Sequence, residues 1–385
     1  MHRSRISAQL TAWLTVILLG AATLSAASKW TLLFPTTSIN TLSRFAPTSV
    51  YDPATNSMIV FGGYVDGLTT QNDVLALSHA NGLGGTPAWS TIIANAAAGS
   101  PAARYYQTAV YDESNSRMIV FGGCTLSPIF CGPGLSDVWV LVNANGLGGT
   151  PTWTQLAPSG TAPAGRIGHA AVYDAANNRM TVFGGDDVGH HTFSDVWVLT
   201  NANGLGGTPA WIQLSPSGGP PDTIDFSSAV YDSVDNIMIT FGGAGPGFSQ
   251  DSSGVWTLSH ANGLGGSPVW TNIIPSGTNG SPQRRDGHTA VYDAANNRMI
   301  IFGGNSTASP NGFPMFNDVW VLANASGVGG TPQWTHLKTK GIAPGRRVDS
   351  TAVYDAANNR MIIYGGASWE AYFYGPTVLT GANGL

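Results

Sequence analysis

Arginine recurs at one position of a repeated pattern, seven residues before a Tyr-Asp pair. It is present in five of six copies, and the fourth copy has Ile224 instead. The five arginines are Arg44, Arg104, Arg166, Arg285 and Arg347. A guanidinium presents a planar fork of N–H donors that matches a carboxylate. One hypothesis is therefore a ring of arginines that binds an acidic ligand such as a uronic or sialic acid.

An aspartate later in the same repeats offers these arginines a partner within the protein. Because the fourth copy lacks the arginine and has Gly254 in place of the aspartate, we predict that the two residues form ion pairs inside each repeat. The predicted pairs are Arg44–Asp73, Arg104–Asp137, Arg166–Asp195 and Arg285–Asp318. Arg347 breaks the pattern, since the residue expected opposite it is Thr377. It is therefore the arginine freest to bind a ligand.

Two further groups of residues are candidates for binding. His169 and His288 stand four residues before the tyrosine in their repeats, where packing or lining a channel is the main interpretation and ligand binding the alternative. The segment 369–374 joins Trp369, Glu370 and Tyr372, a combination of aromatic faces and a carboxylate that suits sugar recognition. Glu370 is also the one candidate for a catalytic acid or base. Packing of this segment against the N-terminal strand is the alternative.

Metal binding and cysteine pairing concern two more loops. Asp187, His190 and His191 offer oxygen and nitrogen ligands within a short reach, so a divalent ion is a weak possibility beside an ordinary solvated loop. We expect no cofactor. Cys124 and Cys131 have six residues between them, and in an exported protein this spacing favours a local disulfide.

These residues belong to six copies of one unit. Tyr-Asp begins at positions 51, 111, 173, 231, 292 and 354, and Gly-Gly follows each pair ten or eleven residues later. Short apolar runs separated by Gly, Pro, Asn and Asp predict four β-strands in each unit. Only two glutamates and three lysines are present, so good helix formers are scarce. The fold class predicted is all-β.

Six four-stranded antiparallel units with two apolar faces each are expected to stack radially into a β-propeller. The repeats span about 44–103, 104–165, 166–221, 222–284, 285–346 and 347–385. The last repeat ends before its fourth strand, whereas residues 28–43 contain a strand around Trp30 that has no unit of its own. We predict that this strand pairs with the last blade and closes the ring. Truncation of a longer gene is another explanation of the abrupt end.

Phe-Gly-Gly after an apolar strand, a tryptophan 26–30 residues later and an arginine before the next strand form the repeat signature. This signature resembles the Kelch repeats of the galactose oxidase central domain, in their secreted bacterial type. The resemblance implies the same propeller fold. It implies no copper site, because the cysteine that such a site needs is expected to be paired with the second cysteine.

Residues 1–27 have the pattern of a secretory signal peptide. Arg3 and Arg5 precede an apolar run, and small residues follow it. We therefore expect a secreted or periplasmic protein, with residues 28–385 forming a monomeric propeller. A formal net charge of −5 argues against nucleic acid as a partner. No later stretch is long and apolar enough to span a membrane.

The loops of the predicted propeller fall on two faces. Face two carries the loops between the first and second strands and between the third and fourth strands, which are nearly identical from repeat to repeat. Face one carries the loops between repeats and between the second and third strands, which vary strongly. Because variable loops on a rigid scaffold usually carry binding, we expect a module that binds a glycan or a surface protein at the channel mouth on face one. No nucleophile elbow or zinc motif is present. The alternative is an exported carbohydrate-active enzyme of epimerase, lyase or oxidase type acting on acidic sugars. A surface or matrix component is a third possibility.

Overall fold

The computed structural model describes residues 27–37, 43–65, 69–127, 130–189, 191–221, 225–248, 250–307 and 313–385. The expected signal peptide therefore lies outside the described residues except for Ala27, as do His190 and Ile224. Within the described residues, no helix is long and apolar enough to cross a membrane.

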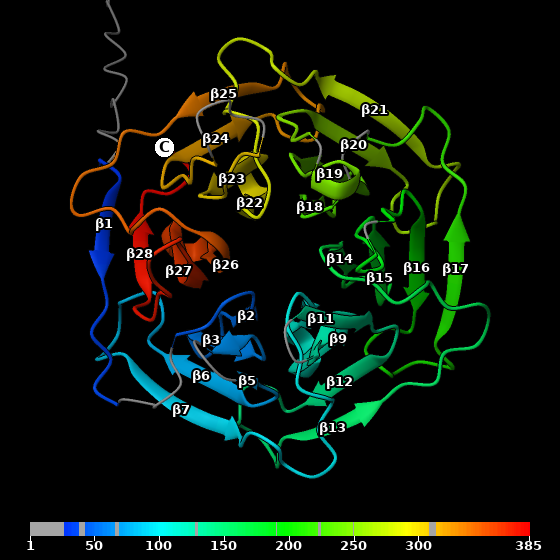
Figure 1. Cartoon of the computed structure of the whole chain (residues 1–385), viewed down its shortest axis with the longest axis vertical. Helices are drawn as coiled ribbons and strands as arrows, with labels where there is room; N and C mark the ends of the chain where they lie inside the picture. The colour runs from blue at the N-terminus through cyan, green and yellow to red at the C-terminus, as the bar shows by residue number, and fades with distance from the viewer. Residues whose placement is uncertain are drawn as a thin grey trace, which may run out of the picture.

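Six four-stranded antiparallel sheets surround a common axis, so the predicted six-bladed all-β propeller is confirmed (Figure 1). From the axis outward, blade one is β2 (Thr48–Asp52), β3 (Ser57–Phe61), β6 (Val74–Ser78) and β7 (Ala88–Ile93). Blade two is β8 (Thr108–Asp112), β9 (Arg117–Phe121), β12 (Val138–Val142) and β13 (Thr152–Gln155). Blade three is β14 (Ala170–Asp174), β15 (Arg179–Phe183), β16 (Val196–Thr200) and β17 (Ala210–Leu214).

The second half of the ring repeats this order. Blade four is β18 (Ser228–Asp232), β19 (Ile237–Phe241), β20 (Val255–Ser259) and β21 (Val269–Ile274). Blade five is β22 (Thr289–Asp293), β23 (Arg298–Phe302), β24 (Val319–Ala323) and β25 (Gln333–His336). Blade six is β26 (Val348–Asp355), β27 (Arg360–Ala367), β28 (Thr377–Thr380) and β1 (Lys29–Leu32). Two small hairpins on face one, β4 (Tyr64–Val65) with β5 (Thr69–Thr70) and β10 (Cys124–Ser127) with β11 (Phe130–Gly134), complete the strands.

The core lies between neighbouring blades. The second strand of each blade is an almost wholly buried apolar run, as its unbroken hydrophobic sequence predicts. Its last aromatic residue packs on the tryptophan of another blade's outer strand, as in Phe121 with Trp211 at 5.2 Å and Phe183 with Trp270 at 4.7 Å. Each such ring removes a large apolar area from water, so these pairs hold the blades together.

The N-terminal strand closes the ring as predicted. β1 pairs antiparallel with β28, from Lys29 opposite Thr380 to Leu32 opposite Thr377. Trp30 is 2% exposed and packs on Phe302 of blade five, the contact that an outer-strand tryptophan makes elsewhere in the ring. Figure 1 shows the blue β1 beside the red β28. The first and last described segments therefore build one blade.

The repeated loops on face two bind neighbouring blades to one another. Asn203, in the loop after β16, donates from Nδ2 to Asp112 of blade two at 2.6 Å, and its backbone oxygen accepts a bond from Arg117 at 2.9 Å. The same Asn-to-Asp bond recurs around the ring, in Asn81–Asp355, Asn145–Asp52, Asn262–Asp174 and Asn383–Asp293. The uniformity of these loops thus has a structural cause.

Candidate functional site

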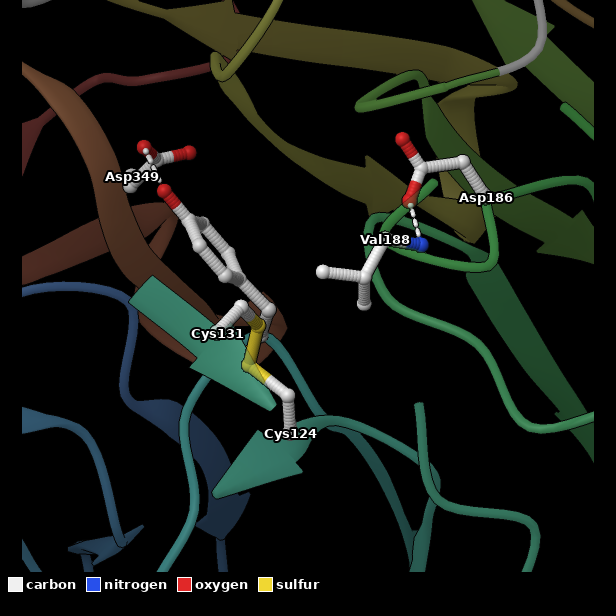
Figure 2. Close-up of a disulfide and its surroundings, with 6 residues drawn as sticks. Cys124, Cys131, Asp186, Val188 and Asp349 are labelled. Atoms are coloured by element: carbon white, nitrogen blue, oxygen red, sulfur yellow. Dashed lines mark hydrogen bonds between the residues drawn. A yellow bond between two sulfur atoms is a disulfide. The ribbon is translucent and has the colours of Figure 1, made fainter. Parts of the chain in front are cut away.

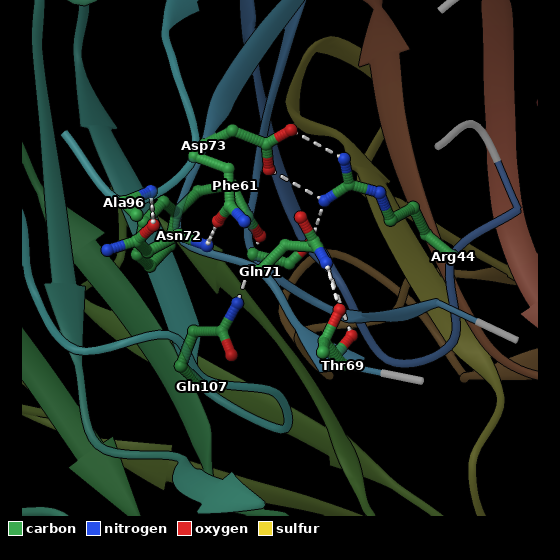
Figure 3. Close-up of polar contacts among 10 residues, drawn as sticks. Arg44, Phe61, Thr69, Gln71, Asn72, Asp73, Ala96 and Gln107 are labelled. Atoms are coloured by element: carbon green, nitrogen blue, oxygen red, sulfur yellow. Dashed lines mark hydrogen bonds and ion pairs between the residues drawn. The ribbon is translucent and has the colours of Figure 1, made fainter. Parts of the chain in front are cut away.

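The four predicted ion pairs form, and each is bidentate. Arg44 donates from Nη1 and Nη2 to the two carboxylate oxygens of Asp73 at 2.8 and 2.7 Å (Figure 3). The pairs Arg104–Asp137, Arg166–Asp195 and Arg285–Asp318 have closest distances of 2.6, 2.7 and 2.7 Å. All four arginine side chains are fully buried. Although burial acts to raise it, bonding to Arg104 holds the pKa of Asp137 below its usual value.

Each of these arginines is also bound to the backbone. In Arg166, Nη1 donates to the Gly184 oxygen at 2.8 Å and Nε to the Ala164 oxygen at 3.0 Å, while the guanidinium lies 4.3 Å from the Phe193 ring. Such a buried, bidentate pair with satisfied donors positions strands within its blade. These four arginines are therefore structural, and the hypothesis of a ligand-binding ring of arginines does not apply to them.

Arg347 has the same backbone contacts and no carboxylate. It is 3% exposed, and it donates from Nε to the Gly345 oxygen and from Nη1 to the Gly365 oxygen, both at 3.0 Å. Its guanidinium lies 3.8 Å from the ring of Phe373. Among the described residues, Nη2 has no hydrogen-bond partner. Burial lowers the pKa of Arg347 to about 10, so the side chain is still charged at neutral pH.

The structure corrects the residue expected opposite Arg347. Phe373 donates its backbone N–H to Gly366, as Phe193 donates to Gly185 in blade three. The residue two positions later is Asp195 in blade three and Gly375 in blade six. Thr377 instead takes the position of Trp197, because Ile363 pairs with Thr377 as Val182 pairs with Trp197. The sequence comparison missed this, since the loops before the third strands differ in length.

A cavity of about 660 Å³ opens where blade six lacks these side chains. Its walls come from β1, from the link before β26 and from the loop between β27 and β28, and they include Leu32, Phe34, Ile342, Arg347, Tyr372, Tyr374, Gly375 and Thr377. Phe34 and Ile342 are 78% and 91% exposed, and Tyr374 is 66% exposed. The chemistry is one buried cation at an otherwise apolar and aromatic surface. This blade-six cavity is the candidate site.

The expected members of the 369–374 segment are divided. Tyr372 lines the blade-six cavity and lies near Phe45 and Tyr64 on face one, with ring centroids 6.1 and 6.2 Å apart. Trp369 is 71% exposed and bonds to the Phe313 oxygen at 3.4 Å. Glu370 is exposed, and its backbone N–H bonds to Ser368. The segment lines the same cavity as β1, so the structure agrees in part with the alternative that the segment packs against the N-terminal strand.

His169 and His288 lie in the contacts between blades, and neither lines the blade-six cavity. Their Nε2 atoms lie 2.7 Å from the hydroxyls of Thr108 and Ser228, and their rings pack edge-on against Phe121 and Phe241. Burial, with a nearby arginine, lowers the pKa of each to about 3, so both are neutral. Both also line an axial cavity of about 190 Å³. The structure therefore supports packing and channel lining, and it does not bring them to the candidate site.

Buried carboxyl groups near the axis were not anticipated from the sequence. The side chains of Asp225 and Asp286 are 2% and 5% exposed, and that of Asp349 is partly exposed. The three residues come from blades four, five and six. Burial, with Asp186 beside the first and Asp251 beside the second, raises the pKa of Asp225 and of Asp286 to about 9. Burial raises the pKa of Asp349 to about 7. Aromatic side chains, including Tyr106, cover this region.

The predicted Cys124–Cys131 disulfide is present and joins β10 to β11 (Figure 2). Both cysteines belong to an apolar cluster with Tyr106, Ile167 and Val188. Figure 2 shows Val188, Asp186 and Asp349 in the surroundings of the disulfide. The disulfide therefore fixes part of the cover over the channel mouth on face one.

Asp187 and His191 lie together as the weak metal hypothesis requires, with Oδ2 and Nδ1 3.0 Å apart. The His191 side chain is 83% exposed, and His190 lies outside the described residues. Within the described ranges, no three His, Cys, Asp or Glu side chains are grouped so that they could hold a metal ion. A hydrogen-bonded surface loop accounts for the geometry observed.

Six radial blades, with Phe-Gly-Gly in five and Tyr364-Gly365-Gly366 in the sixth, and with a tryptophan on each outer strand, define a Kelch-type β-propeller. Residues 132–279 and 266–378 match the KLHDC2/KLHL20/DRC7 Kelch-repeats domain, so this chain belongs to that Kelch-repeat family. A solved structure titled "Structure of YjhT" is similar in fold, with a TM-score of 0.61 at 15% identity over 91% of this chain and 95% of that one.

Curated relatives are larger proteins. Human Multiple epidermal growth factor-like domains protein 8 is 26% identical over 276 residues, which are 68% of this chain and 9% of that protein. Adagio-like protein 3 of Oryza sativa subsp. japonica is 26% identical over 329 residues, 82% of this chain and 45% of that protein. The chain thus spans less than half the length of either relative.

Proposed function

We propose that this Kelch propeller is an exported interaction module that binds an extracellular protein partner on face one, with the blade-six cavity as its anchor. The observation that carries the proposal is Arg347, a buried cation whose four counterparts are neutralised by an aspartate of their own blade. A partner carboxylate at Nη2 would supply the missing charge and would raise the pKa of Arg347 toward its usual value.

The walls of the cavity favour a peptide over a glycan. Besides Arg347, hydrogen-bonding side chains at the cavity are few, whereas Leu32, Phe34 and Ile342 expose apolar surface to it. Sugars need several directed hydrogen bonds, while apolar peptide side chains are bound by burial of area. Kelch propellers are commonly protein-interaction modules, which agrees with this choice. Export rests on the signal-peptide pattern of residues 1–27.

An array that carries acidic peptides, their Asp→Asn and Glu→Gln counterparts, and acidic and neutral glycans tests the proposal. We expect the purified protein to bind acidic peptides, and the variant Arg347→Met, which keeps the apolar stem, to lose them. The proposal is overturned if the bound set is the same for both proteins. Binding of acidic glycans without acidic peptides would instead favour the carbohydrate alternative.

A further inference from the structure

We propose that the blade-six cavity recognises a peptide in which a carboxylate and an aromatic side chain stand two residues apart, as in Asp-x-Trp. This inference rests on the proposed function, since it uses the same cavity, and it names the ligand more narrowly. The argument comes from the other blades, where the chain's own residues fill the equivalent space.

Three blades place an Asp-Val-Trp sequence against their arginine. In blade three, Asp195 bonds to Arg166, and Trp197 donates from Nε1 to Asp195 Oδ2 at 2.6 Å. The corresponding indole bonds in blades two and five measure 2.7 and 2.8 Å. Because residues i and i+2 of a strand share one face, the carboxylate and the indole stand side by side, with the carboxylate bound to the guanidinium. This arrangement is a built-in ligand for each arginine.

Blade six lacks both side chains of this pair. Gly375 stands where the aspartate would be, and Thr377 stands where the tryptophan would be, yet Arg347 keeps its backbone bonds and its aromatic contact with Phe373. The guanidinium of Arg347 is therefore positioned as in the other blades, whereas the carboxylate and the indole that accompany it there are absent. The cavity of about 660 Å³ occupies that space.

The outer strand of blade six offers a surface for the aromatic ring. In blade five, Trp320 stacks on His336 of the paired outer strand, with ring centroids 4.7 Å apart. In blade six, the residue paired in that way with Thr377 is Leu32, which is 47% exposed. An indole that entered the cavity would cover Leu32 while its peptide's carboxylate reached Arg347.

Four capped peptides test the order and chemistry of the motif by calorimetry or fluorescence anisotropy. We expect acetyl-Asp-Val-Trp-amide to bind, and the Asn-Val-Trp and Asp-Val-Ala peptides to bind about tenfold more weakly or worse, through loss of a charged hydrogen bond or of ring burial. Acetyl-Asp-Trp-Val-amide has the same composition with the two side chains on opposite faces of a strand, and it should bind as poorly.

A variant that restores the missing carboxylate separates this inference from a merely structural role of Arg347. Gly375→Asp should raise the melting temperature by forming the ion pair seen in four blades, and it should abolish binding of acetyl-Asp-Val-Trp-amide. A Cβ at this position would meet only the end of the exposed Leu32 side chain within 4 Å, at 2.9 Å, so the substitution can be accommodated. The control Gly375→Ala adds the same Cβ beside Leu32 without the charge, so the further loss of binding from Gly375→Ala to Gly375→Asp measures the effect of the carboxylate alone.

The outcomes distinguish the two proposals. If acidic peptides bind through Arg347 but Asp-Val-Trp is no better than Asp-Trp-Val, the motif is wrong and the proposed function stands. If peptide binding survives in Gly375→Asp, the cavity is not the site and the inference fails. If no acidic peptide binds the wild-type protein, the proposed function fails with it.

Discussion

Asp225 and Asp286 are buried carboxyl groups near the axis and Asp349 is a partly buried one, and no arginine or lysine of the described residues forms an ion pair with them. A carboxyl group without a basic partner in a low-dielectric region is stable only when it is protonated. These side chains therefore make the stability of the fold depend on pH, because the unfolded chain releases protons that the folded chain retains.

The Asp225→Asn variant tests this dependence. The pKa of Asp225 is raised from 3.8 to about 9, so the stability that its protonated form contributes is complete below pH about 4 and is lost as pH rises toward 9. Replacing the group by a neutral amide should leave stability nearly unchanged at pH 4 and increase it by several kcal/mol at pH 8. Urea unfolding across pH 4–9 measures the difference.

The exposed Asp235 serves as the control, since Asp235→Asn should change the pH profile little. A gain for Asp225→Asn that is the same at every pH would show that Asp225 is charged in the folded protein. His169 and His288 have the opposite effect on the pH dependence of stability. Because their pKa is lowered to about 3, the stability that their neutral form contributes is lost below pH about 6. The two effects are separable because the control comparison is made at each pH.

At the scale of elements, β1 has the most distinct position, because it completes a blade whose other three strands lie more than 300 residues later in the sequence. Without β1, the edge of β28 would expose unpaired backbone groups, which favour association with other chains. Trp30 supplies most of the contact of β1 with the core, as its burial beside Phe302 shows.

Trp30→Ala should therefore cost as much stability as the loss of an outer-strand tryptophan inside a continuous blade. We expect both Trp30→Ala and Trp211→Ala to lower the free energy of unfolding by about 3–5 kcal/mol, measured by urea titration. The exposed Phe34→Ala should cost under about 0.5 kcal/mol. A much smaller cost for Trp30 than for Trp211 would mean that β1 is only loosely attached to blade six.

In the whole molecule, hydrogen bonds join each blade of the ring to its neighbours. Backbone bonds link blades near the axis, such as Tyr106 N–H to the Ala46 oxygen at 3.2 Å and Asp349 N–H to the Gly287 oxygen at 2.8 Å. The Asn-to-Asp bonds link them again on face two. Since every blade is held by two neighbours, a closed ring should unfold cooperatively rather than blade by blade.

Asn203→Ala tests the contribution of one Asn-to-Asp hydrogen bond between blades. The variant removes the bond to the buried carboxylate of Asp112, together with the bonds that Asn203 Oδ1 accepts from Asn178 and from the Leu205 N–H, and it should cost about 2–3 kcal/mol in calorimetric unfolding. Blade five provides the matched control, because it has Ser326 at this position, and Ser326 bonds to Asn297 of its own blade. Ser326→Ala should cost about 1 kcal/mol. Equal losses of stability in Asn203→Ala and Ser326→Ala would show that the Asn-to-Asp bond between blades adds nothing to stability.

The repeat architecture can be predicted from the sequence, because every blade must present the same apolar strands and turn residues to equivalent neighbours. The sequence also predicted the four ion pairs, since Arg and Asp are missing together from the fourth repeat, and the closing strand, since the Trp30 segment had no unit of its own. The disulfide followed from spacing within one loop. All of these depend on local pattern or on comparison of repeats.

Which residues meet at the blade-six cavity depends on the three-dimensional fold and not on local sequence. Gly375 was identified as the counterpart of aspartate by strand pairing, because the loop before β28 cannot be aligned by length. The blade-six cavity joins β1 to segments more than 300 residues away, and the axial carboxyl groups come from three different blades. Such sites form where ring closure brings together segments that are far apart in the sequence, and no local sequence pattern predicts that these segments are neighbours.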